Sequence, residues 1–309
     1  MNAVDADIAA ISTRIEDLIA QCNIGTMLHS VVILHGGLSK QTWKFTTERG
    51  VYVYQKGNEP WPLSDQLLHI LYKNNITIEA LYYNAEQAEA IFVHIDGKQL
   101  DQQGITRQQQ INVLAQRLCR LHQIKLSASL KNITRLDHSS LSALLTNLLS
   151  KVDDEKLLRF LGYGRQQIKQ LSERLIDALE IDEQRLCVNH GDANMANVII
   201  ADKDLHPWFI DLDCACLAEP EYDIAMCMAI NALTDDERLA FARHYQAGIE
   251  PKDVKIEHEK VTRYLDICLL INALWYFPEF SRINQISQIK VALGHIDSAK
   301  SMLHRWSMR

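Results

Sequence analysis

The chain has 309 residues, of which 47% are hydrophobic and 23% charged, so it is long enough for two domains with a substantial buried core. Its 32 basic and 39 acidic residues give a formal net charge of −7, and no cluster of Lys or Arg supplies the basic face that nucleic-acid binding requires. The mild acidic excess is compatible with a cationic substrate.

The first hundred residues predict a helix followed by a β-rich region. An opening amphipathic helix is predicted by apolar residues at helical spacing, namely Ile8, Ile11, Ile15, Leu18 and Ile19. Extended runs rich in β-branched and aromatic residues predict strands at 31–34, 43–47, 51–54, 80–83 and 90–95. A short helix is predicted over 65–73, after a loop that contains two prolines. We therefore expect a small β-rich N-terminal lobe over 1–96.

From Gly97 onward the pattern becomes mainly helical. Apolar residues at helical spacing predict helices around 111–121, 141–149 and 168–179, and a capping box at Thr234 and Glu237 predicts the start of another. Extended structure returns only in short apolar runs, at 186–188, 198–200 and 208–210. We expect a hinge near 95–98, a larger helical lobe over 97–309, and an α+β fold class.

Targeting and redox features are few. The N-terminal residues lack a basic segment followed by an apolar one, which argues against a secretory signal. The longest apolar stretch, 267–277, is too short to cross a bilayer. The seven cysteines are scattered rather than arranged as a disulfide framework. We expect a cytoplasmic protein with reduced thiols and with neither a membrane nor a nucleic-acid partner.

The richest polar segment reads His-Gly-Asp-Ala-Asn-Met-Ala-Asn over 190–197 and is followed by Ile-Asp-Leu-Asp over 210–213. Both segments adjoin predicted strands, which hold side chains rigidly while the loops expose them. Carboxylate and amide oxygens of this kind suit Mg²⁺, which takes its other ligands from phosphates and water. Phosphoryl transfer also requires a carboxylate that orients the acceptor hydroxyl, and Asp192, five residues before Asn197, is placed for that role.

At these residues the chain resembles the aminoglycoside phosphotransferase/choline kinase family, relatives of protein kinases, and it is most similar to the choline/thiamine kinase-like branch. The family motif is H-G-D-x-x-x-x-N, followed by I-D-x-[DE]. The resemblance implies a two-lobed protein-kinase-like fold with a β-rich N-lobe and a larger, mostly helical C-lobe. It implies that Asp192 is the catalytic base, that His190 braces the loop, and that Asn197 and Asp211 bind Mg²⁺. Asp213 stands where members often have Glu, either at the metal or behind its ligands.

The loop over 35–40 resembles the family's phosphate-covering loop. Glycine lets backbone N–H groups approach phosphates closely, so Gly36, Gly37 and Ser39 are the expected nucleotide contacts. The alternative is an ordinary hairpin turn. The sequence contains no Walker A pattern.

The third strand of the family carries a cation for the α- and β-phosphates. The closest alignment puts that position at Gln55, yet we predict Lys56, which requires a register shift or a bulge because strand residues alternate faces. The alternative is a solvated lysine at the strand end. Asp65, at the start of the next helix, is the expected acidic partner.

Two further segments follow the family order. Residues 90–97 resemble the hinge strand, where the backbone of Phe92, Val93 and His94 would pair with adenine. His122 ends a segment that resembles the following L-x-x-L-H helix and is expected to be a packed structural residue. Asp223 matches a later element that usually braces the site.

The aromatic segment 269–280 is the candidate for acceptor binding. It resembles the late aromatic helix of choline and thiamine kinases, and Trp275, Tyr276 and Glu279 would hold a cationic acceptor through ring faces and a carboxylate. The alternative is that these aromatic rings pack in the core of the lobe.

The sequence therefore predicts a kinase that transfers the γ-phosphate of ATP, with Mg²⁺, to a hydroxyl of a small molecule, preferably choline- or thiamine-like. One alternative is an aminoglycoside or other antibiotic kinase. Another is a nucleotide-binding pseudokinase, which the irregular strand lysine favours and the complete motif opposes. A zinc site is the third, because thiols and an imidazole surround the motif, namely Cys187, His190, Cys214 and Cys216. Their spacing matches neither a C-x₂-C pair nor H-E-x-x-H.

Overall fold

The computed structural model describes residues 3–29, 31–34, 40–126, 133–249, 256–279 and 286–308. The chain forms two compact units. The first comprises Met1–Lys98, Ala128–Ile133 and Ile199–Asp213, and the second comprises the remaining residues. The sequence predicts a second lobe over the whole of 97–309, whereas the structure returns Ile199–Asp213 to the first unit.

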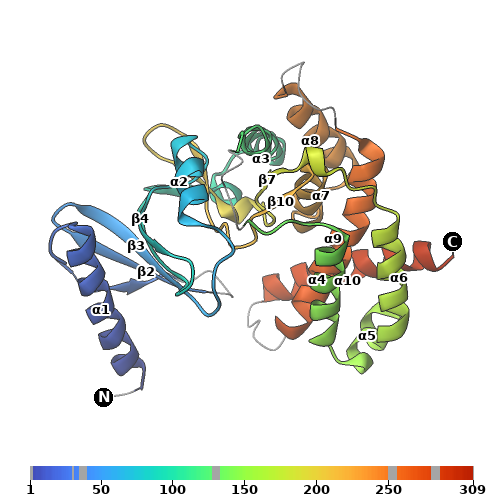
Figure 1. The fold of residues 1–309 in the computed structure, drawn as a ribbon, viewed down its shortest axis with the longest axis horizontal. Coiled ribbons are helices and arrows are strands. Elements are labelled where there is room, and N and C mark those ends of the chain that lie inside the picture. Colours follow the sequence, from blue (N-terminus) through green and yellow to red (C-terminus); the bar gives the residue numbers. More distant parts are fainter. Residues whose placement is uncertain are drawn as a thin grey trace. The chain divides into compact units, whose positions relative to one another are not determined.

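A five-stranded antiparallel sheet in the order β1-β2-β3-β5-β4 forms the centre of the first unit (Figure 1). Its strands are β1 (Val32–Ile33), β2 (Lys40–Thr47), β3 (Gly50–Gly57), β4 (Ala80–Asn84) and β5 (Glu89–Val93). Strands β2 and β3 pair without interruption, from Lys40 opposite Gly57 to Thr47 opposite Gly50. The five predicted strands are confirmed, although the first is shorter than expected and the fifth ends at Val93 instead of Ile95.

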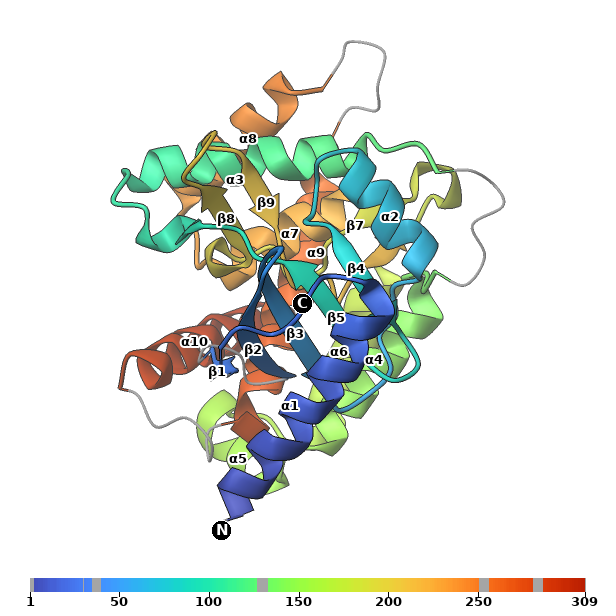
Figure 2. The ribbon, with the colours of Figure 1, turned by 90° about the vertical axis from the view of Figure 1, so that its left-hand side faces the viewer.

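Helix α1 (Ala3–Cys22) covers one face of this sheet, as Figure 2 shows. Its buried residues Ile15 and Leu18 belong to the same hydrophobic cluster as Phe45 of β2 and Tyr54 of β3. Because successive strand residues point to opposite faces, Gln55 lies on the other face, where it lines a pocket. The predicted amphipathic helix is confirmed.

Helix α2 (Asp65–Lys73) begins and ends at the predicted residues, and the Ser64 hydroxyl accepts a hydrogen bond from the Leu67 N–H group at its start. A smaller sheet of order β6-β8-β9 consists of β6 (Gly97–Gln99), β8 (Val198–Ala201) and β9 (Pro207–Phe209). The Phe209 N–H group donates to the Ile76 carbonyl at 2.9 Å. The Thr77 hydroxyl donates to the Phe209 carbonyl at 2.8 Å, so the end of β9 is fixed.

The second unit is mainly helical. Its helices are α3 (Arg107–His122), α4 (His138–Ser150), α5 (Asp154–Leu161), α6 (Arg165–Asp177), α7 (Pro220–Ile230), α8 (Asp235–Ala247), α9 (His258–Glu279) and α10 (Ile286–Ser307). Short 3₁₀ turns lie at η1 (Leu100–Gln102), η2 (Glu183–Arg185) and η3 (Met195–Asn197). Helix α7 is buried on all sides, and Thr234 with Glu237 forms the predicted capping box of α8.

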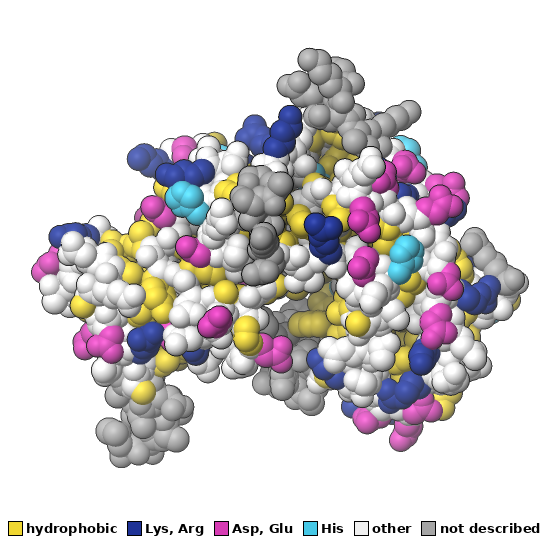
Figure 3. All heavy atoms as spheres, viewed as in Figure 1, with side chains coloured by type: hydrophobic (Ala, Val, Ile, Leu, Met, Phe, Trp, Pro, Cys, Tyr) yellow, Lys and Arg dark blue, Asp and Glu magenta, His cyan; other side chains and the backbone are white. Residues whose placement is uncertain are grey.

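The surface and the thiols give few further signals. Among the described residues on the face drawn in Figure 3, basic and acidic side chains are interspersed. All seven cysteines are free thiols. Within the described ranges, none of the helices combines the length and the apolar character that crossing a bilayer demands.

Candidate active site

The motif over 190–197 forms the loop between β7 (Cys187–Asn189) and β8. In this loop two amide side chains hold the carboxylate of Asp192. The Asn197 Nδ2 atom donates to Asp192 Oδ2 at 2.8 Å and to the Asp192 carbonyl at 2.9 Å. The Asn194 Nδ2 atom donates to Asp192 Oδ1 at 3.2 Å. Because the amide nitrogen of Asn197 is engaged, its amide oxygen is the atom that can bind a cation.

Asp223 of α7 braces this loop from the buried side. Its side chain is fully buried and accepts hydrogen bonds from the N–H groups of His190, at 2.7 Å, and Gly191, at 3.0 Å. The Nε2 atom of His122 lies 3.1 Å from the same carboxylate. Burial alone would raise the pKa of Asp223, but the His122 contact and the backbone donors outweigh it and lower the pKa.

His190 is also fully buried, and its Nδ1 atom lies 3.3 Å from the backbone nitrogen of Asp192. The imidazole therefore contacts the backbone of the loop. Gly191 crosses closely over Cys214, because a Cβ atom added to Gly191 would lie 2.2 Å from the Cys214 carbonyl oxygen. The backbone of Gly191 is also left-handed, with φ of +76°.

We expect the substitution Gly191→Ala to destabilise the protein more than Gly104→Ala. Gly104 has a similar φ of +69° but no atom within 4 Å of the added Cβ, so its variant pays only the left-handed backbone cost of about 1–2 kcal/mol. Gly191→Ala adds the clash with Cys214, worth about 1–3 kcal/mol. Urea unfolding of both variants measures the difference, and equal losses of stability would contradict the close packing of the loop.

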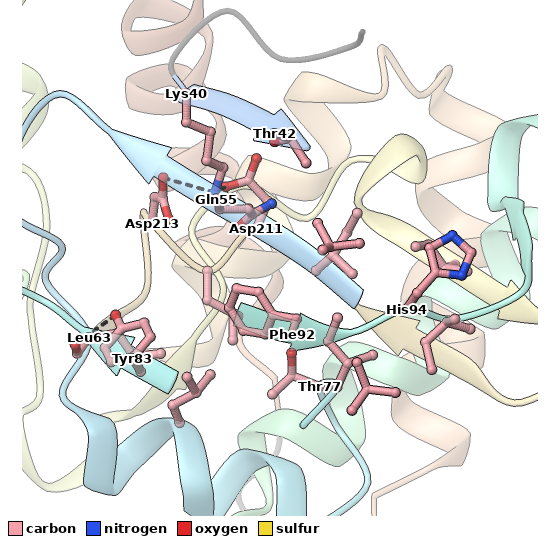
Figure 4. A pocket seen from close by; sticks show the side chains of 18 of the residues that line it. Lys40, Thr42, Gln55, Leu63, Thr77, Tyr83, Phe92, His94, Asp211 and Asp213 are labelled. Atoms are coloured by element: carbon pink, nitrogen blue, oxygen red, sulfur yellow. Dashed lines mark hydrogen bonds and ion pairs between the residues drawn. The ribbon is translucent and has the colours of Figure 1, made fainter. Parts of the chain in front are cut away.

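A pair of carboxylates, Asp211 and Asp213, lies in the first unit, after β9. Figure 4 shows the side chains of Lys40, Asp211 and Asp213 pointing toward one another. The Lys40 Nζ atom lies 2.7 Å from Asp211 Oδ1 and 3.0 Å from Asp213 Oδ2. Asp211 has a φ of +61°, a left-handed conformation that only a few non-glycine residues adopt and that is concentrated at functional sites.

These two carboxylates fit a cation site, since a single ammonium group already bridges them. Burial alone would lower the pKa of the Lys40 ammonium, but Asp211 and Asp213 outweigh burial and raise it. Among the described residues, no group of three or more His, Cys, Asp and Glu side chains forms a metal site. Asp211 and Asp213 would therefore share Mg²⁺ with amide, phosphate or water oxygens, as Mg²⁺ sites usually do, and the zinc alternative lacks its ligands among the described residues.

The prediction for Lys56 needs correction. Strands β2 and β3 pair without the shift or bulge that this residue requires, so its side chain lies on the face covered by α1. There the Lys56 Nζ atom lies 3.2 Å from Glu89, which also pairs with Arg14 of α1 at 2.8 Å. Lys40 is the cation of the pocket instead. In the sequence its only signal is its position at the end of the glycine-containing loop over 35–40.

Asp65 does not act as the acidic partner in this geometry. It is exposed in the first turn of α2, and within the described residues its carboxylate forms no ion pair with Lys56. The predicted loop contacts Gly36, Gly37 and Ser39 lie outside the described residues.

The pocket on the face of the five-stranded sheet opposite α1 has a volume of about 180 Å³. Apolar side chains dominate its lining, to which Phe92, Val93 and His94 all contribute. Their backbone is less available than expected, because the N–H group of Val93 donates to Glu79 and that of His94 donates to Val51.

The next residue, Ile95, lines the same pocket. Among the described residues, neither its N–H nor its carbonyl group forms a backbone hydrogen bond. Of Val93, His94 and Ile95, Ile95 is therefore the one whose N–H group is not engaged by the backbone. The sequence carries no signal for this difference, since it depends on which strand neighbours accept each amide.

The predicted acceptor residues lie near the end of α9. Trp275 is 40% exposed, whereas Phe277 is 1% exposed and belongs to the core. The ring of Tyr276 stacks on His295 with centroids 5.1 Å apart. Burial and the charge of Asp192 raise the pKa of Tyr276. The Glu279 side chain lies outside the described residues.

The β-rich first unit, the helical second unit and the 190–213 motif define a protein-kinase-like phosphotransferase fold. The chain belongs to the phosphotransferase enzyme family, whose model matches residues 30–256. No curated protein is significantly similar to it in sequence.

Solved structures show the same fold. The choline kinase LicA from Streptococcus pneumoniae superposes with a TM-score of 0.67 at 16% identity, over 96% of this chain and 99% of that one. The spectinomycin phosphotransferase APH(9)-Ia, in complex with ADP and spectinomycin, has a TM-score of 0.65 at 13% identity, over 96% and 98% of the two chains. A Plasmodium vivax ethanolamine kinase has a TM-score of 0.64 at 15% identity, over 87% and 82%. The family resemblance and the fold class are therefore confirmed.

Proposed function

We propose that this protein is an ATP-dependent kinase that phosphorylates a hydroxyl group of a small cationic molecule. The observation that carries the proposal is the pair of hydrogen bonds that Asn197 and Asn194 donate to the Asp192 carboxylate. The loop that contains them is braced by buried Asp223. A carboxylate fixed in this way is preorganised to accept the proton of an alcohol as its oxygen attacks the γ-phosphorus. The family membership of the chain supports the same chemistry.

The nucleotide is assigned to the pocket of the first unit. Its apolar lining suits a purine ring, and the N–H group of Ile95 would bind the edge of the base. Asn197, Asp211 and Asp213 would hold Mg²⁺, which when bound neutralises negative charge on the phosphates. Two of the structurally similar proteins were solved with ADP or AMP, which supports a nucleotide donor.

The acceptor is assigned to the end of α9. Trp275 presents an exposed ring, and the charge of Asp192 contributes to the raised pKa of its neighbour Tyr276. An aromatic face attracts a cation by about 0.5–2 kcal/mol, so a choline- or thiamine-like alcohol is the preferred acceptor. A cytoplasmic location is part of the proposal, because ATP is available there and the cysteines are unpaired.

ADP release across a panel of choline, ethanolamine, thiamine, sugars, spectinomycin and aminoglycosides, with and without Mg²⁺, tests the proposal. We expect release that depends on both Mg²⁺ and a cationic alcohol.

As a substitution control, Trp275→Ala should raise KM for that acceptor about three- to thirtyfold while leaving KM for ATP unchanged, as expected for loss of one or two cation–π contacts.

Two other outcomes would redirect the proposal. Turnover only with aminocyclitol or aminoglycoside acceptors would favour an antibiotic kinase, as one of the structurally similar proteins is a spectinomycin phosphotransferase. Nucleotide binding without ADP release on any acceptor would favour a pseudokinase.

A further inference from the structure

Lys40 is a buried cation held by three groups. Its side chain is 5% exposed, and its Nζ atom lies 2.7 Å from Asp211 and 3.0 Å from Asp213. The same atom lies 5.7 Å from the centre of the Trp61 ring. A buried ammonium group requires compensating anions, so Lys40 leaves its two carboxylates only if other negative charges replace them.

Lys40 is also the cation best placed for phosphates. The neighbouring pocket position on β3 is the neutral Gln55, which lies opposite Thr42 of β2. Burial and the charge of Lys44 lower the pKa of His94, so that ring is neutral near pH 7. Within the described lining of the pocket, Lys40 thus supplies the only permanent positive charge.

The ion pairs of Lys40 with Asp211 and Asp213 conflict with metal binding in the nucleotide-free state. The Lys40 ammonium occupies the position between Asp211 and Asp213 that a divalent cation would take. An ammonium group and a divalent ion are both positively charged, so they repel each other strongly if both lie between the same two carboxylates. Metal binding therefore requires the lysine to move away.

We propose that Lys40 is a counter-ion exchanged between two partners, so that divalent metal binds only together with a polyphosphate. Without nucleotide the ammonium neutralises Asp211 and Asp213 and excludes the metal. Nucleotide phosphates take Lys40, whose flexible side chain extends from the first residue of β2, and thereby open the carboxylates to the metal. The inference rests on the proposed function for the identity of the nucleotide.

Mn²⁺ binding to the nucleotide-free protein tests this exchange. Electron paramagnetic resonance of the free ion measures the binding. The variant Lys40→Met keeps the length of the side chain and removes its charge. Lys56→Met is the matched control, because that lysine lies on the neighbouring strand and pairs with Glu89 instead. We expect Lys40→Met to bind Mn²⁺ about tenfold or more tightly than the unaltered protein, and Lys56→Met to bind it equally. A folded Lys40→Met variant with unchanged or weaker Mn²⁺ binding would overturn the proposal.

A second measurement needs no variant. Mn²⁺ alone should leave the thermal midpoint of the unaltered protein unchanged at a concentration at which Mn²⁺ with ADP raises it. An equal rise with Mn²⁺ alone contradicts the exchange, whether or not Lys40→Met folds. Neither measurement uses turnover. A protein that transfers no phosphate but shows the gain in Lys40→Met therefore loses the proposed activity and retains the exchange.

Discussion

Replacing Asp192 by Asn is expected to lower the turnover number by a factor of about 10²–10⁴, the usual contribution of a general base. The substitution removes the group that accepts the proton of the acceptor hydroxyl. It retains an oxygen for one of the two amide donors, Asn194 and Asn197, that hold the side chain. We expect KM for ATP to stay within a few-fold of its original value, because the nucleotide pocket lies in the other unit.

A structural role for Asp192 would give a different result. Asn194→Ala removes one hydrogen bond to Asp192 and the cap of η3, but it leaves the carboxylate in the protein. This variant should lose far less turnover than Asp192→Asn, even if its loss of stability is similar. Initial rates of ADP release and urea unfolding of both variants separate the two roles. Equal losses of turnover would show that the loop geometry, and not the carboxylate, supports activity.

The sequence predicts those parts of the structure that depend on local patterns. Helix α2 has its predicted bounds because a Pro-containing loop precedes it directly, and the Ser64 hydroxyl caps its first turn. The sequence also predicts that Asp192 and Asn197 share one short loop, and the structure adds the hydrogen bond between their side chains. The fixed spacing of that motif made it the strongest sequence signal for the site.

The cation of the pocket could not be predicted in the same way. Its identity depends on which face each strand residue presents, and a single uninterrupted pairing between β2 and β3 decides against Lys56. The neutral Gln55 at the expected position was a usable signal, because it required a cation from elsewhere. The ion-pair partners of Lys40 cannot be predicted from the sequence, because Asp211 and Asp213 follow it by more than 170 residues.

Asp223 is also separated in sequence from the loop it braces, yet its removal is expected to have the largest effect on stability. Its buried carboxylate accepts two backbone N–H groups of the loop and contacts His122. Asp223→Ala leaves all three donors without their acceptor, and breaking a buried pair of this kind costs about 3–5 kcal/mol. The exposed Asp236→Ala in α8 is the matched control and should change the free energy of unfolding by less than about 1 kcal/mol.

The pH dependence of stability gives this prediction a second test, which remains useful if Asp223→Ala does not fold. The pKa of Asp223 is lower in the folded protein than in the unfolded chain, so its contribution is fully present above about pH 4. The contribution is lost as the pH falls further and the folded-state carboxylate is protonated. Asp223→Asn cannot be protonated in this range, so its urea-unfolding free energy should fall less between pH 5 and pH 3 than that of the unaltered protein. Parallel curves for the two proteins would mean that the carboxylate charge of Asp223 does not stabilise the loop.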